Sequence, residues 1–195
     1  MDQQRELYEP SSRFFHVASS VGGQVAVWGG QTSEFYSKDG MTKLASVVEQ
    51  FDPYSEVWCQ RGTTGIPHPG LSEAACTSFG NHLFMYGGLR DGKASSANGV
   101  LTRLNVAADT CTLVWSQLCP ETAGGPMRKY GCGMVHFHHN KLAVIGGHGY
   151  STIDPTGPTE PGSSFMRNTK FEDGRGWTNE FHVFYISQGS HSQVH

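Results

Sequence analysis

The stretch LFMYGGLRDG, residues 83–92, runs from four apolar residues directly into a pair of glycines. The same arrangement occurs as VAVWGG at 25–30 and as LAVIGG at 142–147. The glycine pairs begin at 29, 87 and 146, so successive pairs are 58 and 59 residues apart. Such a regular recurrence indicates an internal repeat, and the period of a repeat is the strongest single guide to architecture.

Each glycine pair closes the second of four strand-like segments. In the first copy these segments are RFFHVASSV, QVAVWGG, SVVEQFD and SEVWCQ; in the second they are EAACTSFG, HLFMYGG, GVLTRLNV and CTLVWSQL. Gly and Asn between the first two segments suit tight turns between antiparallel strands. No segment shows a helical period with caps. The sequence therefore predicts an all-β chain made of four-stranded units.

Composition supports this prediction and excludes some functions. Charged residues make up only 16% of the chain, and 25 of the 195 residues are glycine, as expected for short strands joined by tight turns. The net charge of -3 offers no basic field for a nucleic acid, and no apolar run is long enough to span a membrane. The five cysteines form no CxxC pair, so we expect reduced thiols in the cytoplasm or the nucleus.

The third copy differs from the other two. It opens as MRKYGCGMVHF and NKLAVIGG, but its third strand, NEFHVFYIS, follows a long insertion at 148–176, and no fourth strand with a tryptophan follows. The expected organisation is an amino-terminal tail, three repeats and a polar tail: 1–12, 13–62, 63–120, 121–187 and 188–195. Closed propellers use about four to eight blades. We therefore expect an incomplete ring whose open blade faces tend to self-associate.

These motifs resemble the kelch repeat, in which one repeat forms a four-stranded propeller blade. Its diglycine corresponds to three pairs here, and its spaced tryptophan to one residue in each complete copy: Gly29 and Gly30, Gly87 and Gly88, Gly146 and Gly147, Trp58 and Trp115. Glycine adopts positive φ and has no Cβ, so the pair can turn an inner strand where backbones crowd together. We expect the tryptophans to fill the gaps between blades.

A candidate binding surface follows from the order of the strands. The connection from strand two to strand three and the segment that joins two blades emerge at the same end of a meander. In the third copy these segments carry cationic and aromatic residues: Arg128, Lys129, Tyr130, His148, Tyr150, Arg175 and Trp177. Such a cluster suits a peptide carboxylate or an acidic side chain. The alternative is that Trp177 packs on its own blade edge and the charges form a solvated rim.

Catalytic and metal-binding patterns are weak. His136 and His138 share a strand face in VHFHHN, but no carboxylate or cysteine nearby completes a zinc site. The sequence contains no Ser/His/Asp arrangement, phosphate-binding glycine loop or paired carboxylates at a recognisable spacing. We therefore predict a protein without enzymatic activity, metal or cofactor.

A narrower resemblance is carried by GGHGY at 146–150 and RGWTNEFHVF at 175–184. This order is similar to the kelch-domain substrate receptors of cullin-RING ubiquitin ligases. The resemblance implies recognition of protein carboxy termini by a basic and aromatic pocket, and docking on elongin and cullin through a carboxy-terminal part that we do not find here. Trp177 matches the pocket tryptophan, His148 stands where the family has a tyrosine, and Lys129 is nearest to the pocket lysine.

The sequence thus predicts a protein-interaction module that binds a protein or peptide tail. A structural kelch scaffold, for example one associated with the cytoskeleton, is the alternative function. The two differ in whether the third copy's surface recognises a peptide terminus.

Overall fold

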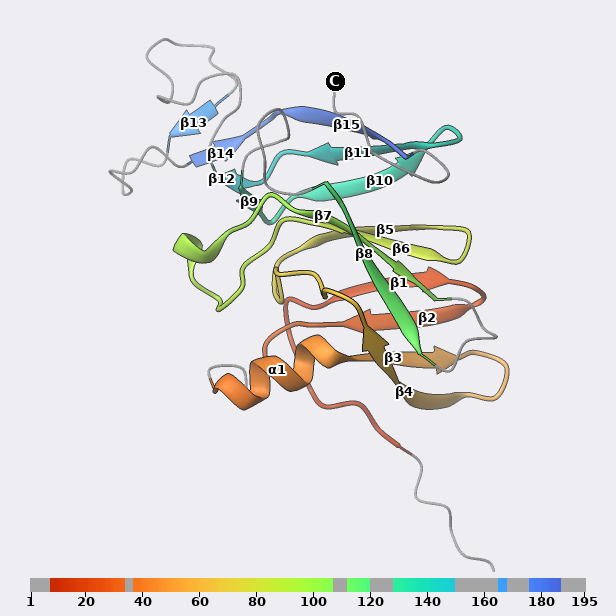
Figure 1. Cartoon of the computed structure of the whole chain (residues 1–195). Coiled ribbons are helices and arrows are strands. Elements are labelled where there is room, and N and C mark those ends of the chain that lie inside the picture. The colour runs from red at the N-terminus through yellow and green to blue at the C-terminus, as the bar shows by residue number, and fades with distance from the viewer. Residues whose placement is uncertain are drawn as a thin grey trace, which may run out of the picture.

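Three antiparallel meanders lie in layers, one above another, in the computed structural model of the chain (Figure 1), which describes residues 8–33, 37–106, 112–119, 128–149, 165–167 and 176–186. The first meander contains four strands: β1 (Val17–Val21), β2 (Gln24–Trp28), β3 (Val47–Asp52) and β4 (Val57–Thr64). Each strand pairs antiparallel with the next in sequence. The first repeat is therefore a simple meander, as its alternating turns and strands predict.

The second meander repeats the first. It contains β5 (Ala75–Phe79), β6 (His82–Tyr86), β7 (Leu101–Asn105) and β8 (Leu113–Cys119), again paired in sequence order, with a short 3-10 helix, η1 (Ala94–Ser96), between β6 and β7. The two outer strands β4 and β8 also pair briefly in parallel at Thr63 and Thr64. This pairing joins the two meanders into one eight-stranded sheet.

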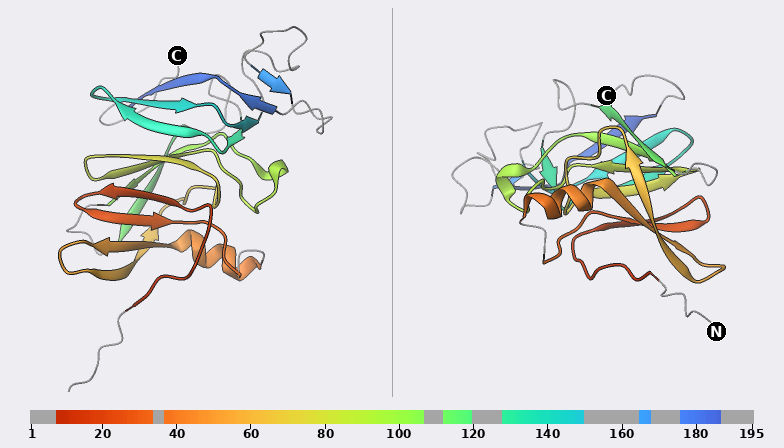
Figure 2. Two further views of the ribbon diagram at one scale, coloured as in Figure 1. Left: turned by 180° about the vertical axis from the view of Figure 1, so that it is seen from behind. Right: turned by 60° about the horizontal axis from the view of Figure 1, so that its bottom comes forward.

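The third meander has three described strands in one sheet, β10 (Gly133–Phe137), β11 (Lys141–Ile145) and β15 (Phe181–Tyr185). A small separate sheet lies beside it and contains β9 (Lys129–Tyr130), β12 (His148–Gly149), β13 (Phe165–Arg167) and β14 (Gly176–Thr178). The three layers make an incomplete all-β propeller. Seen from behind, α1, η1 and β13 all lie along one side of the stack (Figure 2).

One helix in this architecture was not expected from the sequence. Helix α1 (Lys38–Ser46) lies between β2 and β3, and the Ser37 hydroxyl caps it by accepting a hydrogen bond from the Gly40 N–H. Leu44 of this helix is buried in the core between the first two blades. Nine residues with an internal glycine have little intrinsic helicity, so the cap and the buried leucine stabilise a helix that sequence periodicity did not reveal.

The apolar core lies between the blades. Trp28 of the first blade meets Trp115 of the second edge to face, with ring centroids 5.2 Å apart, and both indoles are buried. Tyr86 and Phe184 join the second blade to the third at 5.6 Å. Trp115 therefore fills an interblade gap, as the repeat predicts. Trp58 is half-buried and packs on Phe51 of its own blade, 5.1 Å away, so its role between blades stays a prediction.

The outer face of the sheet formed by β10, β11 and β15 exposes apolar side chains. Alternation along β10 turns Met134 toward the core and Val135 outward, where Val135 is 44% exposed. Ile145 and Phe181 are cross-strand partners on β11 and β15, and both are also exposed. Self-association through this face stays a prediction, and the exposed face is the feature that motivates it.

The three glycine pairs share one backbone conformation. All six glycines have positive φ, between 65° and 94°. The second glycine of the first two pairs also donates a hydrogen bond to the segment entering the next blade: Gly30 N–H to the Leu71 carbonyl (2.6 Å) and Gly88 N–H to the Lys129 carbonyl (2.8 Å). A Cβ at Gly87 would collide with that same Lys129 carbonyl oxygen. Glycine is therefore required both by φ and by the close approach of the next blade.

Replacing Gly87 with alanine is expected to lower the free energy of unfolding by roughly 2–5 kcal/mol, because left-handed strain and a backbone collision add together. Gly80→Ala is the matched control, since Gly80 also has positive φ (56°) but its Cβ would meet open space. The control should lose only about 1–2 kcal/mol, the cost of the left-handed conformation. Urea unfolding of both variants measures the difference, and equal losses would contradict the interblade role.

Candidate functional site

A buried polar pair ties the segment entering each blade to residues at or near that blade's third strand. In the first blade Arg13 pairs with Glu49, in the second His68 with Thr102, and in the third Lys129 with Glu180. Arg13 and Lys129 lie 58 residues before and after Leu71, so they occupy equivalent positions in the repeat. The polar pairs are therefore a repeated feature of the face that also carries the predicted binding residues.

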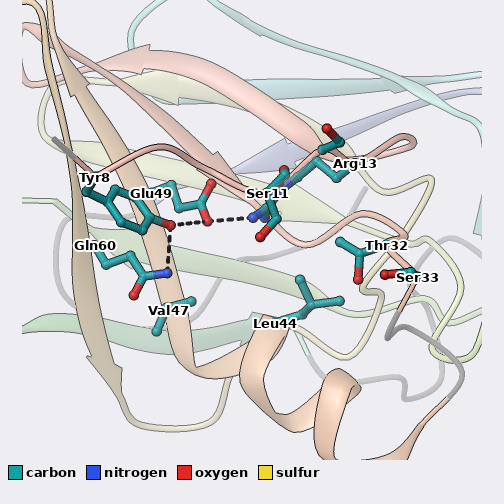
Figure 3. Close-up of a pocket in the computed structure, with 10 residues that line it drawn as sticks. Tyr8, Ser11, Arg13, Thr32, Ser33, Leu44, Val47, Glu49 and Gln60 are labelled. Atoms are coloured by element: carbon teal, nitrogen blue, oxygen red, sulfur yellow. Dashed lines mark hydrogen bonds and ion pairs between the residues drawn. The ribbon is translucent and has the colours of Figure 1, made fainter. Parts of the chain in front are cut away.

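In the first blade, Glu49 is the centre of a small hydrogen-bonded network (Figure 3). Its Oε1 accepts from Arg13 Nη2 at 2.5 Å and from the Tyr8 hydroxyl at 2.8 Å, and Gln60 Nε2 donates to the Tyr8 oxygen at 2.7 Å. Burial, together with the hydrogen bond and the negative charge of Glu49, raises the pKa of Tyr8 to about 12. Tyr8 therefore stays protonated and donates to the carboxylate.

In the second blade, His68 is completely buried between a backbone carbonyl and a threonine hydroxyl. Its Nε2 lies 2.8 Å from the Gly87 carbonyl oxygen, and its Nδ1 lies 2.9 Å from the Thr102 hydroxyl. A carbonyl can only accept, so Nε2 carries the proton and Nδ1 accepts from the threonine. Burial lowers the pKa of His68 to about 4, which keeps the ring neutral in this arrangement.

In the third blade, Lys129 is fully buried, which departs from its predicted place on the binding surface. Its ammonium pairs with the Glu180 carboxylate and donates to Thr178 Oγ1 at 3.1 Å. His182 Nε2 lies 3.1 Å from the same carboxylate, and burial is the main cause that lowers the pKa of this histidine. The charge of Lys129 therefore holds the blade together rather than facing solvent.

Three of the predicted residues form an aromatic group at the edge of the third blade. His148 pairs with Tyr130 of β9 on one side and with Trp177 of β14 on the other. The His148 ring is buried, and its centroid lies 5.0 Å from that of Tyr130 and 5.1 Å from that of Trp177. Trp177 stands edge to face on His148 and is 52% exposed. The structure thus presents an indole to solvent on a fixed support.

The other predicted residues lie around this group or outside the described part of the chain. Arg128 is exposed and directly precedes β9. Tyr150 and Arg175 lie outside the described residues, as does most of the 148–176 insertion. The structure therefore brings Tyr130, His148 and Trp177 together and turns Lys129 inward.

Sequence reasoning missed the carboxylates. Glu49 and Glu180 are both buried, yet neither was among the predicted site residues. The signal that was available is the repeat itself, because Arg13 and Lys129 occupy equivalent positions and a buried cation requires an anionic partner. Which carboxylate supplies it depends on the fold, since Glu180 is 51 residues from Lys129.

The histidine-rich turn is structural. His138 and His139 both have positive φ in the turn between β10 and β11. His136 stacks on Phe79 of the second blade at 4.1 Å, and its Nε2 lies 2.8 Å from the His139 carbonyl oxygen. Within the described ranges, no three His, Cys, Asp or Glu side chains converge as metal ligands would. Over the same ranges, no helix has the length and apolar character needed to cross a membrane.

The layered meanders and their glycine pairs define a kelch-type β-propeller. The chain resembles the solved structure of YjhT with a TM-score of 0.54 and 14% identity, over 97% of this chain and 71% of that one. Kelch domain-containing protein 2 is 26% identical in Rattus norvegicus and 25% identical in Homo sapiens, in each case over 91% of this chain. This chain spans 43% of the length of these relatives.

A second kind of relative carries an enzyme name. N-(sulfonatooxy)prop-2-enimidothioate sulfolyase from Thlaspi arvense is 33% identical over 91 residues, which is 45% of this chain and 25% of that protein. No protein-family model matches the chain. The similarity to YjhT and to kelch domain-containing protein 2 agrees with the fold.

The buried pair in the third blade is expected to be strongly coupled. Lys129→Met and Glu180→Leu should each lower the free energy of unfolding by about 3–5 kcal/mol, because each leaves one buried charge without its ion-pair partner. The double variant should lose much less than the sum of the two, since it leaves no unpaired charge.

Urea unfolding of the four proteins in this cycle gives the coupling energy. Lys141→Met is the control, because the Lys141 ammonium lies over the Tyr185 ring, 5.2 Å from its centroid, and its loss should cost about 1 kcal/mol or less. Additive losses in the cycle would contradict the buried ion pair.

His68 is expected to make the stability depend on pH. Its folded pKa of about 4 lies below the ordinary histidine value of about 6.5, so the unfolded chain binds the proton more readily. The contribution is fully present above pH 6.5 and is lost as the pH falls toward 4. Between pH 7 and pH 5, wild type should lose about 2 kcal/mol more than His68→Gln. Parallel losses in urea unfolding at the two pH values would contradict this assignment.

Proposed function

We propose that this chain is a non-enzymatic protein-interaction module that binds a protein or peptide tail at the edge of the third blade. The binding surface consists of Trp177, His148, Tyr130 and Arg128. The observation that carries the proposal is the exposure of Trp177, which leaves half of an indole in solvent on a rigid support. Tryptophan and arginine are the residues that most often dominate the energetics of protein interfaces.

The geometry of the surface suits an extended segment that ends in a carboxylate. His148 is buried between its two strand neighbours, so binding would not have to order the support of the indole. Arg128 supplies a cation at the start of β9, next to the aromatic group. An indole that packs on the peptide and a guanidinium that pairs with its terminal carboxylate are complementary to such a ligand.

The finer proposal is that the chain is part of a substrate receptor for a cullin-RING ubiquitin ligase. Its support is the diglycine followed by the insertion and Arg-Gly-Trp at 175–177, together with similarity to kelch domain-containing protein 2 over 91% of the chain. Contacts with elongin and cullin would be made by a carboxy-terminal part beyond this sequence. We propose the cytoplasm or the nucleus as its compartment, because the cysteine pattern suits a reducing environment.

The peptide-binding surface is tested with the full chain and a peptide ending in glycine, prepared with a free carboxylate and with an amide. Trp177→Ala should weaken binding of the free-acid peptide by about tenfold or more, the loss expected for an interface tryptophan. Fluorescence anisotropy of labelled peptides measures both affinities.

Trp58→Ala is the matched control, because Trp58 is a half-buried tryptophan on the outer strand of the first blade. It should leave the affinity unchanged. Equal binding of the free acid and the amide would refute recognition of the carboxylate, and equal binding by the Trp177 and Trp58 variants would refute the location of the site.

A further inference from the structure

A cavity of about 410 Å³ lies against the first blade, at a different site from the Trp177 surface. It is lined by the segment around Tyr8 to Arg13, by α1 and by strands β3 and β4 (Figure 3). Its volume falls within the range of about 300–1,000 Å³ that is typical of small-molecule sites. Size alone does not define a ligand, so the chemistry of the walls has to do so.

The wall contains a buried carboxylate with one unsatisfied oxygen. Glu49 is 2% exposed, and its Oε1 accepts from both Tyr8 and Arg13. Its Oε2 is also buried, and no hydrogen-bond donor reaches it from any residue that the structure describes. A buried carboxylate oxygen without a donor is costly, so this position favours an incoming group with N–H or O–H.

The neighbouring cation, Arg13, does not donate a hydrogen bond to Oε2 of Glu49. Arg13 donates from Nη1 to the Gly29 carbonyl at 3.1 Å, from Nε to the Ser11 carbonyl at 3.3 Å and from Nη2 to Glu49 Oε1. These three bonds fix the guanidinium in place on one side of the carboxylate. Arg13 contacts Oε1 only, so Oε2 of Glu49 keeps its capacity to accept.

The remaining lining suits a positively charged head on an apolar stem. Hydroxyls of Ser11, Ser12 and Ser33 can accept further hydrogen bonds, while Leu44 and Val47 supply an aliphatic wall. An ammonium group has three donors and no acceptor, which matches one carboxylate oxygen and surrounding hydroxyls. We propose that this cavity is a binding site for an alkylammonium group, which a free amine or a lysine side chain can supply.

This site is independent of the proposed function, because it lies on the first blade and contains none of the residues of the Trp177 surface. A variant that loses amine binding should still bind the carboxy-terminal peptide with unchanged affinity. The two proposals can therefore fail separately.

The probe is butylammonium, which has the length of a lysine side chain. We expect a saturable shift of backbone amide resonances near Glu49 and Leu44 in the ¹H–¹⁵N spectrum of the full chain, with a Kd on the order of 1 mM. Glu49→Gln should weaken binding by about tenfold or more, because a charge-assisted hydrogen bond is lost. Glu56→Gln, which changes an exposed carboxylate in the turn between β3 and β4, should leave binding unchanged.

Because Glu49→Gln also weakens the Arg13 pair, Ser33→Phe provides a second test that keeps both charges. Ser33 is exposed at the cavity wall, so a phenyl ring there should block entry without disturbing the fold. Unchanged butylammonium binding by Ser33→Phe, absence of saturable shifts in wild type, or equal shifts with 1-butanol would each overturn the proposal.

A final comparison distinguishes the two sources of the ammonium. Acetyl-Gly-Lys-Gly-amide is titrated beside the same peptide with norleucine in place of lysine. Lysine-dependent binding at least as tight as that of butylammonium supports a peptide ligand, and weaker binding supports a free amine. Equal binding of the lysine and norleucine peptides at these resonances would contradict recognition of the charge.

Discussion

Two backbone hydrogen bonds hold successive blades in place, and the rest of the structure depends on them. Gly30 and Gly88 each donate to the carbonyl of the segment that enters the next blade. All four glycines of these two pairs have positive φ, and a Cβ at Gly29 or Gly87 would collide with that same carbonyl oxygen, so the entering segment can approach this closely only at glycine. Once this spacing is set, the indoles of Trp28 and Trp115 meet in the interblade core.

The same close approach explains the buried polar pairs. The segment that enters each blade packs against residues at or near the third strand of that blade. The side chains between them are therefore shielded from water. In the first and third blades a cation meets a carboxylate, and in the second a neutral histidine meets a threonine. A buried polar group needs such a partner. The pairs therefore satisfy the hydrogen-bonding capacity of the buried polar side chains on the face of the stack where both proposed sites lie.

The sequence predicted the features that depend on the local conformation of one residue type, such as glycine. It did not predict the features that depend on partners distant in the sequence. The spacing of the glycine pairs revealed the blades, and Trp115 lies between blades as its position in the repeat predicts. Helix α1 was missed because its stability comes from the Ser37 cap and the burial of Leu44 rather than from a long periodic pattern. Lys129 looked like a surface cation because Glu180 follows only after the long insertion.

The sequence by itself determined the repeat, the all-β class and the positions of the glycines, because the conformational limits of glycine are local and recur every 58 or 59 residues. It also placed Tyr130, His148 and Trp177 among the candidates for one surface. Only the tertiary structure decided which charges are buried and which side chains are exposed. Pairing of Glu49 with Arg13, and of Glu180 with Lys129, depends on packing between segments 36 and 51 residues apart. Burial and electrostatic pairing are properties of the assembled blades, so no local pattern determines them.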